Sequence, residues 1–233
     1  MFQTFLVQPI YNAFVFLVGY MPHGDAGLAI IAMTLIMRAA LYPVFTASIR
    51  TQMGMQAMQP ELAAAEKRYK DDKEALGRER LALLRRHKVN PLAGILALVI
   101  QLTLIIALYF ALFRENFPTI DTNLLYAFVH APAAVSTSFF GILDLLTPHH
   151  LLLAVLVGAT QYLAIRLTLK RTPTQGEGDK AAMMKMQQQL MLYFMPALMG
   201  VFSYFFAGAV GLYFLTSNTV SVLQEWLIRR HVL

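Results

Sequence analysis

The sequence predicts an all-α membrane protein with five transmembrane helices, a cytoplasmic helical hairpin and an N-terminal interfacial helix. Hydrophobic residues make up 58% of the 233 residues and charged residues only 14%, whereas soluble domains carry about 25% charged residues. Long uncharged runs alternate with charged segments, as expected of a multi-pass protein. Cysteine is absent, which excludes disulfides, thiolate metal sites and cysteine nucleophiles.

Residues 1–25 contain no Lys or Arg, so they lack the basic start of a secretory signal. Thr4, Gln8 and Asn12 recur every four residues and give a helix one polar face. We interpret this segment as an amphipathic helix lying in the outer interface. A sixth span is the alternative, but it would place an uncharged N-terminus inside, against the positive-inside rule.

The first span, residues 26–50, contains the most informative residue of the chain. Arg38 lies near the middle of a predicted helix from Gly27 to Arg50, which would be about 36 Å long. A guanidinium at that depth costs about 3 kcal/mol or more, and it cannot lose its proton. An internal acid, a water-filled cavity or a ligand must therefore meet it.

No acid of this chain is expected to pair with Arg38, because Asp25, Asp144 and Glu225 all fall near span ends. We therefore favour a hydrated cavity, and a structural arginine bonded to backbone carbonyls is the alternative. Uncharged polar residues at membrane depth are the candidates to line the cavity: Thr34, Gln101, Gln161, Ser217 and Asn218. Taken singly, each could instead form a helix–helix hydrogen bond.

Residues 51–91 predict the cytoplasmic hairpin. Met55, Met58, Leu62, Ala65 and Tyr69 form a heptad seam, and Asp71 and Asp72 can cap a second helix, in which Leu76, Leu83 and Leu84 continue the seam. Basic residues outnumber acids nine to six after Arg50. We expect Arg85, Arg86 and Lys88 to contact anionic lipid or a partner.

The rest of the chain divides by the same criteria. Residues 186–224 carry no charge over 39 positions, too long for one span, so the chain must turn at Ala207–Ala209. The predicted segments are spans at 92–113, 149–170, 189–206 and 209–228, an outer loop at 114–148, a cytoplasmic loop at 171–188 and a short cytoplasmic tail at 229–233.

The basic residues predict the orientation. Residues 114–148 contain one Lys or Arg and residues 170–188 contain four, while the turn at 207–209 has none. High and low counts alternate at every predicted crossing, which places the N-terminus outside and the C-terminus inside.

Nothing in the sequence indicates an enzyme. His149 and His150 are adjacent and do not share a helical face, and Asp121 and Asp144 are better explained as loop caps than as a catalytic pair. We expect no catalytic residue, no metal site and no cofactor.

Several motifs resemble the YidC/Oxa1/Alb3 family of membrane protein insertases, and within it the bacterial members. They are the single arginine of the first span followed by Tyr42-Pro43, Met58-Gln59-Pro60, Lys88-Val89-Asn90-Pro91-Leu92 leading to Gln101, Gly158-Ala159-Thr160-Gln161, and Gly211-Leu212-Tyr213 with Ser217-Asn218. The resemblance covers about residues 5–231.

The resemblance implies a five-helix core with a hydrophilic groove open to the cytoplasm and to lipid. Arg38 matches the family's groove arginine, which receives acidic residues of substrates. Thr34 and Tyr213 match positions of substrate contact, whereas Phe214 stands where many relatives have a second tyrosine. Many relatives also have a large outer domain and some a long basic tail; this sequence shows neither, so we expect any ribosome contact to use the hairpin or short loops.

The predicted function is therefore insertion of nascent polypeptides into the bacterial plasma (inner) membrane, alone or with the Sec translocon. The expected partners are nascent membrane proteins, anionic lipids, the Sec translocon and the ribosome, but no DNA. A small-solute transporter or channel subunit is the alternative, and a membrane scaffold is a third.

Overall fold

The computed structural model describes residues 3–110, 117–169 and 185–232. Its regular structure is almost wholly helical, as the sequence predicts. The elements in chain order are η1 (Gln3–Val7), α1 (Gln8–Tyr20), η2 (Pro22–Gly24), α2 (Ala26–Ala40), α3 (Tyr42–Arg68), α4 (Lys73–Arg86), α5 (Pro91–Tyr109), η4 (Thr122–Leu124), β1 (Ser138–Phe139), β2 (Leu143–Asp144), α6 (Leu151–Leu169), η5 (Leu190–Phe194), α8 (Met195–Phe205) and α9 (Gly208–Val232).

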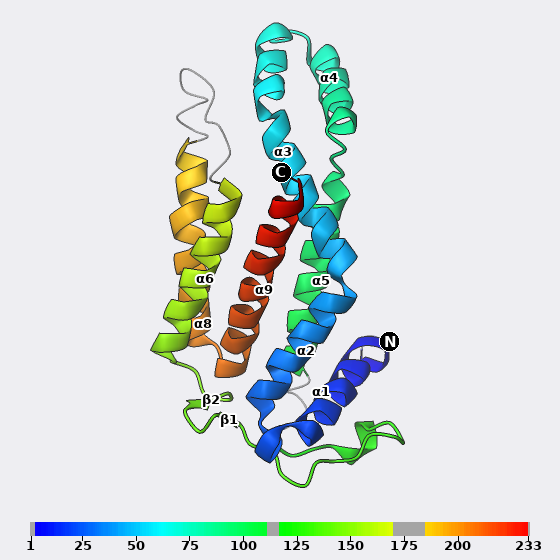
Figure 1. Ribbon diagram of the computed structural model, residues 1–233, viewed down its shortest axis with the longest axis vertical. Helices are drawn as coiled ribbons and strands as arrows, with labels where there is room; N and C mark the ends of the chain where they lie inside the picture. The colour runs from blue at the N-terminus through cyan, green and yellow to red at the C-terminus, as the bar shows by residue number, and fades with distance from the viewer. Residues whose placement is uncertain (1–2, 111–116, 170–184, 233) are drawn as a thin grey trace.

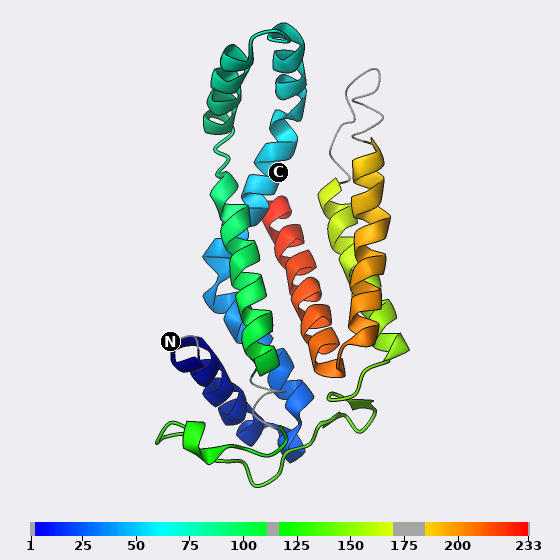
Figure 2. The same ribbon diagram turned by 180° about the vertical axis from the view of Figure 1, so that it is seen from behind.

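The helices form an elongated bundle (Figure 1). Helix α9 lies between two groups, with α6 and α8 on one side and α3 and α5 on the other, as both views show (Figure 2). The α3–α4 hairpin projects at one end of the bundle. Helix α1 and the two-stranded ribbon β1–β2 lie at the opposite end.

The first predicted span is bent, which corrects the continuous helix expected from Gly27 to Arg50. Helices α2 and α3 meet at Leu41 with a bend of 70°. Pro43 is the physical reason, because proline has no N–H and its ring clashes with the carbonyl four residues back in a continuing helix. It is tolerated where it stands, in the first turn of α3.

Helix α3 continues without interruption past Arg50 to Arg68, so no break in the helix marks the boundary predicted between residues 50 and 51. Helix α4 then folds back on α3. Met58 of α3, Leu83 of α4 and Val89, which follows α4, form a small buried cluster. The Asp72 carboxylate caps α4 by accepting a hydrogen bond of 2.9 Å from the Ala75 N–H. The hairpin is therefore held together by its own apolar seam.

Two of the described helices, α5 and α6, are each long and apolar enough to cross a membrane, and the bent α2–α3 pair would be a third. Helix α9 has the length but carries a polar face that includes Ser217 and Glu225. The segment before it is divided into η5 and α8. The count of five spans therefore stays a prediction.

The turn between α8 and α9 falls at residues 206–207, next to the predicted Ala207–Ala209 position. Gly208 is required there, since a Cβ atom on it would lie 2.8 Å from the Asp144 carbonyl oxygen. Its N–H donates to the Thr147 carbonyl at 2.9 Å. The start of α9 is thus pinned to the loop before α6.

The end of the bundle away from the α3–α4 hairpin contains more structure than the loop predicted at 114–148. Strands β1 and β2 pair there as a two-stranded antiparallel ribbon. The Asp25 carboxylate caps α2 through the Gly27 N–H at 2.8 Å and also accepts from the Phe140 N–H at 3.0 Å. This carboxylate therefore joins the start of α2 to the ribbon.

Helix α1 packs against α2 and α5 by its apolar face, and Phe14 and Val18 are fully buried. Its predicted polar face contacts protein. The Asn12 amide donates to the Leu124 carbonyl at 2.9 Å, and its oxygen accepts from the Tyr126 N–H at 2.6 Å. Gln8 donates to the same carbonyl at 3.1 Å. Two of the three residues of the polar repeat, Gln8 and Asn12, therefore bind the outer loop.

Candidate functional site

Arg38 is buried in the last turn of α2, with only 8% of its surface exposed. Its Nη2 donates to Gln101 Oε1 at 3.4 Å and to the Ser217 hydroxyl. The Phe45 ring lies 4.1 Å from the guanidinium carbon, a cation–π contact across the bend. None of the ion pairs found among the described residues involves Arg38.

The bend at Leu41 makes this arrangement possible. Arg38 and Phe45 are seven residues apart and sit on either side of the break between α2 and α3. Gln101 comes from α5 and Ser217 from α9, so three separate parts of the chain hold the guanidinium.

The side chains that bind Arg38 are themselves joined by hydrogen bonds. The Gln101 amide donates to the Tyr213 hydroxyl at 2.8 Å and lies 3.5 Å from the Ser217 hydroxyl. Tyr213 and Ser217 are one turn apart on α9 and are almost fully buried. The donated bonds leave Gln101 Oε1 to face Arg38, so the amide presents its negative end to the cation.

The guanidinium keeps donors that no described residue uses. Arginine has five N–H groups, and the hydrogen bonds of Arg38 to described residues all come from Nη2. Nε and Nη1 are absent from the fully buried, unsatisfied side-chain atoms of the described residues. Because Arg38 lines the cavity described next, the unused donors of its guanidinium are the groups that can bind an anion there.

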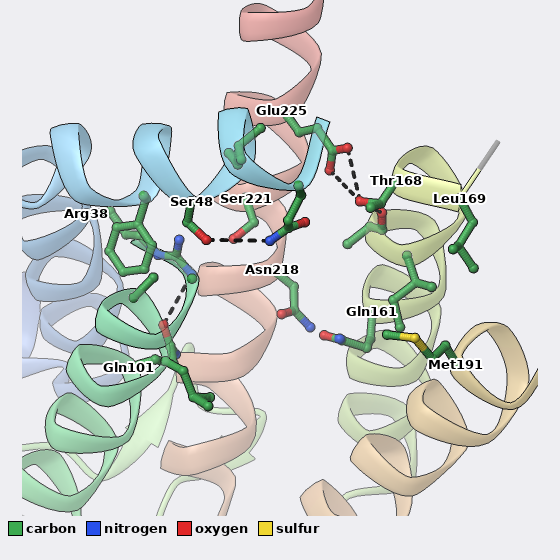
Figure 3. A pocket seen from close by; sticks show the side chains of 18 residues that line it. Arg38, Ser48, Gln101, Gln161, Thr168, Leu169, Met191, Asn218, Ser221 and Glu225 are labelled. Atoms are coloured by element: carbon green, nitrogen blue, oxygen red, sulfur yellow. Dashed lines mark hydrogen bonds between the residues drawn. The ribbon is translucent and has the colours of Figure 1, made fainter. Parts of the chain in front are cut away.

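That space is a cavity of about 380 Å³ between α3 and α5 on one side and α6 on the other, with α9 behind (Figure 3). Its lining mixes polar and apolar side chains. The lining residues are Arg38, Phe45, Ser48, Ile49, Gln52, Gly94, Ala97, Leu98, Gln101, Gln161, Ala164, Ile165, Thr168, Leu169, Met191, Asn218, Ser221 and Glu225.

The structure brings four of the seven predicted groove residues to the cavity wall: Arg38, Gln101, Gln161 and Asn218. The other three lie elsewhere. Tyr213 and Ser217 form the second layer that positions Gln101 and Arg38. The Thr34 hydroxyl donates to the Ile30 carbonyl of its own helix at 2.6 Å, and its side chain is buried in the bundle.

Sequence reasoning missed one charged residue of the wall. Glu225, expected only near a span end, lines the same cavity and is 7% exposed. The Thr168 hydroxyl lies within hydrogen-bond distance of both carboxylate oxygens, at 3.0 and 3.1 Å. The pattern that could have found it is Asn218, Ser221 and Glu225, spaced three and four residues apart on one helical face.

The basic residues predicted on the hairpin are exposed, but one of them has a partner. Arg86 Nη1 lies 3.1 Å from a Glu61 carboxylate oxygen, although its side chain remains 74% exposed. His87 contacts the other oxygen of Glu61 at 2.9 Å. Arg85 and Lys88 are exposed near the start of α5.

The histidines at the start of α6 have structural partners. The His149 ring packs against the rings of Tyr204 and Phe205, and the His150 ring contacts the Asp144 carbonyl at 2.6 Å. Within the part of the chain that the structure describes, no group of three or more His, Asp or Glu side chains could hold a metal ion.

Comparison with known proteins agrees with this architecture. The family described as 60Kd inner membrane protein matches residues 18–233. Three proteins named membrane protein insertase YidC are similar: 34% identity over 97% of this chain in Aliivibrio salmonicida, 33% over 97% in Vibrio atlanticus and 30% over 98% in Haemophilus ducreyi. The chain spans only 37% or 38% of the length of these relatives.

The matches extend from α1 to the end of α9, so they include every helix that lines the cavity. The resemblance to the YidC/Oxa1/Alb3 family is confirmed, and the apolar helices agree with a multi-pass protein of the bacterial inner membrane. The chain with the buried Arg38 cavity belongs to the 60Kd inner membrane protein family.

Proposed function

We propose that this chain is a membrane protein insertase, which moves segments of nascent membrane proteins from the cytoplasm into the bilayer through the Arg38 cavity. The names of its relatives support the activity. The observation that carries the proposal is the buried Arg38 guanidinium, which lines the cavity with donors unused by any described residue.

The guanidinium supplies an attractive site for an acidic side chain in transit. A carboxylate can accept two parallel N–H bonds from arginine, which makes such a pair stronger than a neutral hydrogen bond. Gln101, Ser217 and Phe45 hold the cation in place before a substrate arrives. Little reorganisation is then needed when the carboxylate enters.

The mixed wall explains how a substrate could then leave. Polar residues such as Gln161 and Asn218 replace some of the water around the polar flank of a segment, which lowers its desolvation cost. Exposed apolar side chains, such as Leu98 of α5 and Met191 of η5, border the same cavity. An apolar substrate helix gains about 25 cal/mol per Å² on leaving water for lipid. No covalent step and no cofactor is required.

The proposal includes the predicted topology: five spans, the N-terminus outside and the C-terminus inside. The α3–α4 hairpin and the end of α9 lie at the same end of the bundle, which that topology places in the cytoplasm (Figure 1). Exposed Arg85 and Lys88, together with Arg86, are the proposed contacts for anionic lipid. The Sec translocon and the ribosome are further proposed partners.

Insertion into proteoliposomes tests the proposal. The purified protein should insert a single-span substrate with an acidic leading segment, measured by protease protection. Arg38→Glu should abolish this insertion, because a buried carboxylate repels the acidic residue. Arg50→Glu is the matched control, since Arg50 is exposed on α3 and does not line the cavity.

Insertion by Arg38→Glu at the wild-type level would overturn the role of the cation. Solute flux through the same vesicles that depends on Arg38, with no insertion activity, would favour the small-solute transporter instead.

A further inference from the structure

A second cavity lies between α6 and α8, which run side by side in both views of the bundle (Figures 1 and 2). Its volume is about 660 Å³, and it shares no described lining residue with the Arg38 cavity. Gly158 of α6 and Gly200 of α8 line it where the two backbones come together. Ala159 and Ala197 are exposed on its two walls, where their small side chains leave space. We call this cavity the α6–α8 groove.

The surroundings of the groove are apolar. Leu151 and Val155 of α6 and Val201 and Phe205 of α8 line it and are exposed. Helix α6 is long and apolar enough to cross a membrane, so this exposed surface faces the hydrocarbon of the bilayer. Apolar cavities stay dry. The occupant of the groove is therefore itself apolar, which leaves an acyl chain or another helix.

The size of the groove favours an acyl chain. An apolar cavity of about 150 Å³ holds benzene, with six carbons, so the groove has room for one chain of about sixteen to eighteen carbons, and not for two. The lining residues from Leu151 to Tyr162 extend about 16 Å along α6. A helix about 10 Å across would need about 1,300 Å³ over that length. Only part of a helix could therefore enter.

A cation lies at the hairpin end of the groove. Arg166 lies one turn beyond Tyr162, on the same face of α6. Its guanidinium carbon is 5.9 Å from the centroid of the Tyr162 ring, and that centroid is 6.1 Å from the centroid of the Tyr193 ring. Arg166 is exposed, and none of the ion pairs found among the described residues involves it. Its positive charge is therefore available to an anionic group.

The spacing between the cation and the groove matches one leaflet of a bilayer. Val155 precedes Arg166 by eleven residues, which is about 16 Å along a helix. The hydrocarbon of one leaflet is about 15 Å thick, half of the bilayer core. The long stem of arginine lets its charged group reach the headgroup region. A lipid with its phosphate at Arg166 thus places an acyl chain at the level of the groove.

We infer that the α6–α8 groove binds one anionic phospholipid from the leaflet on the hairpin side of the bundle. Its phosphate lies at Arg166, and one of its acyl chains lies along Gly158 and Gly200. The inference does not rest on the insertase activity, since it requires only that α6 spans the membrane. A lipid that binds the folded protein stabilises it by mass action, so the bound lipid would strengthen the pairing of α6 with α8.

Native mass spectrometry of the protein in detergent tests the headgroup. Phosphatidylglycerol and phosphatidylcholine with the same acyl chains are compared. The wild-type protein should retain one phosphatidylglycerol about fivefold better than phosphatidylcholine, the effect of one basic residue on an anionic lipid. Arg166→Gln should remove this preference, and Arg166→Lys should keep it. Arg50→Gln is the matched control, because Arg50 is exposed on α3 outside the groove, and it should also keep the preference.

The same measurement tests the acyl chain. Ala159→Phe and Ala197→Phe each fill the groove from one wall and should abolish the retention of phosphatidylglycerol. Leu156→Phe adds a ring to an exposed position of α6 outside the groove and should have no effect. A short-chain phosphatidylglycerol has the same headgroup but cannot fill the groove, so it should be lost first. Circular dichroism shows whether each variant is folded, and the two Phe variants test the groove independently.

Several outcomes would overturn the inference. Retention of phosphatidylglycerol at the wild-type level by both Phe variants would place the chain outside the groove. Equal retention of the two headgroups by the wild-type protein would overturn the role of Arg166, as would an equal loss with Arg50→Gln. If gel filtration shows a dimer that Ala159→Phe converts to a monomer, a second copy of the chain occupies the groove in place of lipid.

Discussion

Arg38 is stabilised by neutral groups, and each of them contributes in a different way. Ser217 and Gln101 supply oxygen acceptors, and the Phe45 ring covers the guanidinium at 4.1 Å. An acid of the same chain would neutralise the cation and remove its attraction for a substrate. Neutral partners lower the cost of burial and leave the charge available.

Removal of the Ser217 hydroxyl should therefore destabilise the protein. Ser217→Ala deletes a buried acceptor of a charged donor, and we expect a loss of about 1–3 kcal/mol. Thermal unfolding in detergent measures the effect. Thr219→Ala is the matched control, because Thr219 is exposed on the same helix and bonds only to its own backbone among the described residues. Equal melting temperatures for the two variants would contradict this role of Ser217.

Helices α6 and α8 pack closely because two glycines face each other. A Cβ atom on Gly200 would lie 3.1 Å from the Ala154 carbonyl oxygen, and one on Gly158 would lie 3.2 Å from the Pro196 carbonyl oxygen. Such backbone contact is the usual way in which membrane helices associate, since lipid provides no hydrophobic force between them. Helices α6 and α8 therefore form a closely packed pair beside α9.

Gly200→Ala should lower the melting temperature, although alanine favours a helix over glycine by about 1 kcal/mol. The new methyl group must push α6 and α8 apart against backbone atoms. Gly94→Ala is the matched change, because a Cβ atom there meets nothing within 4 Å, and it should raise the melting temperature. Thermal unfolding of both variants in the same detergent checks the prediction. A higher melting temperature for both variants would show that a methyl group at position 200 fits between α6 and α8 without destabilising the protein.

At the scale of the whole molecule, the cavity must open toward the hairpin end for the proposed function. The lining residue Gln161 lies on α6 one turn from Val157, which is fully buried. The chain contains no cysteine, so a single introduced cysteine can be labelled without background.

Gln161→Cys should react with a membrane-impermeant maleimide added from the cytoplasmic side, whereas Val157→Cys should not. Labelling in inverted and right-side-out vesicles measures the difference. Position 34, a candidate from the sequence, is a poorer probe because Thr34 lies buried against its own helix. Reaction of Gln161→Cys only from the outer side would contradict the proposed orientation.

The sequence by itself determined the features that depend on neighbouring residues. These are the apolar helices, the turn near Ala207, the capped hairpin and the buried cation with no acid within its own span. Hydrophobic periodicity, caps and charge counts are local, so one sequence is enough to read them. The bend at Pro43 was equally local, but its effect on the span was overlooked.

Only the tertiary structure decided which helical faces meet at the cavity. Arg38 and Ser217 are 179 residues apart, and no local pattern shows that they touch. Packing turned Thr34 toward its own backbone, placed Tyr213 behind Gln101 and brought Glu225 into the wall. A polar residue on a membrane helix can bind its own backbone, a neighbouring helix or a cavity, and the arrangement of the other helices selects among the three.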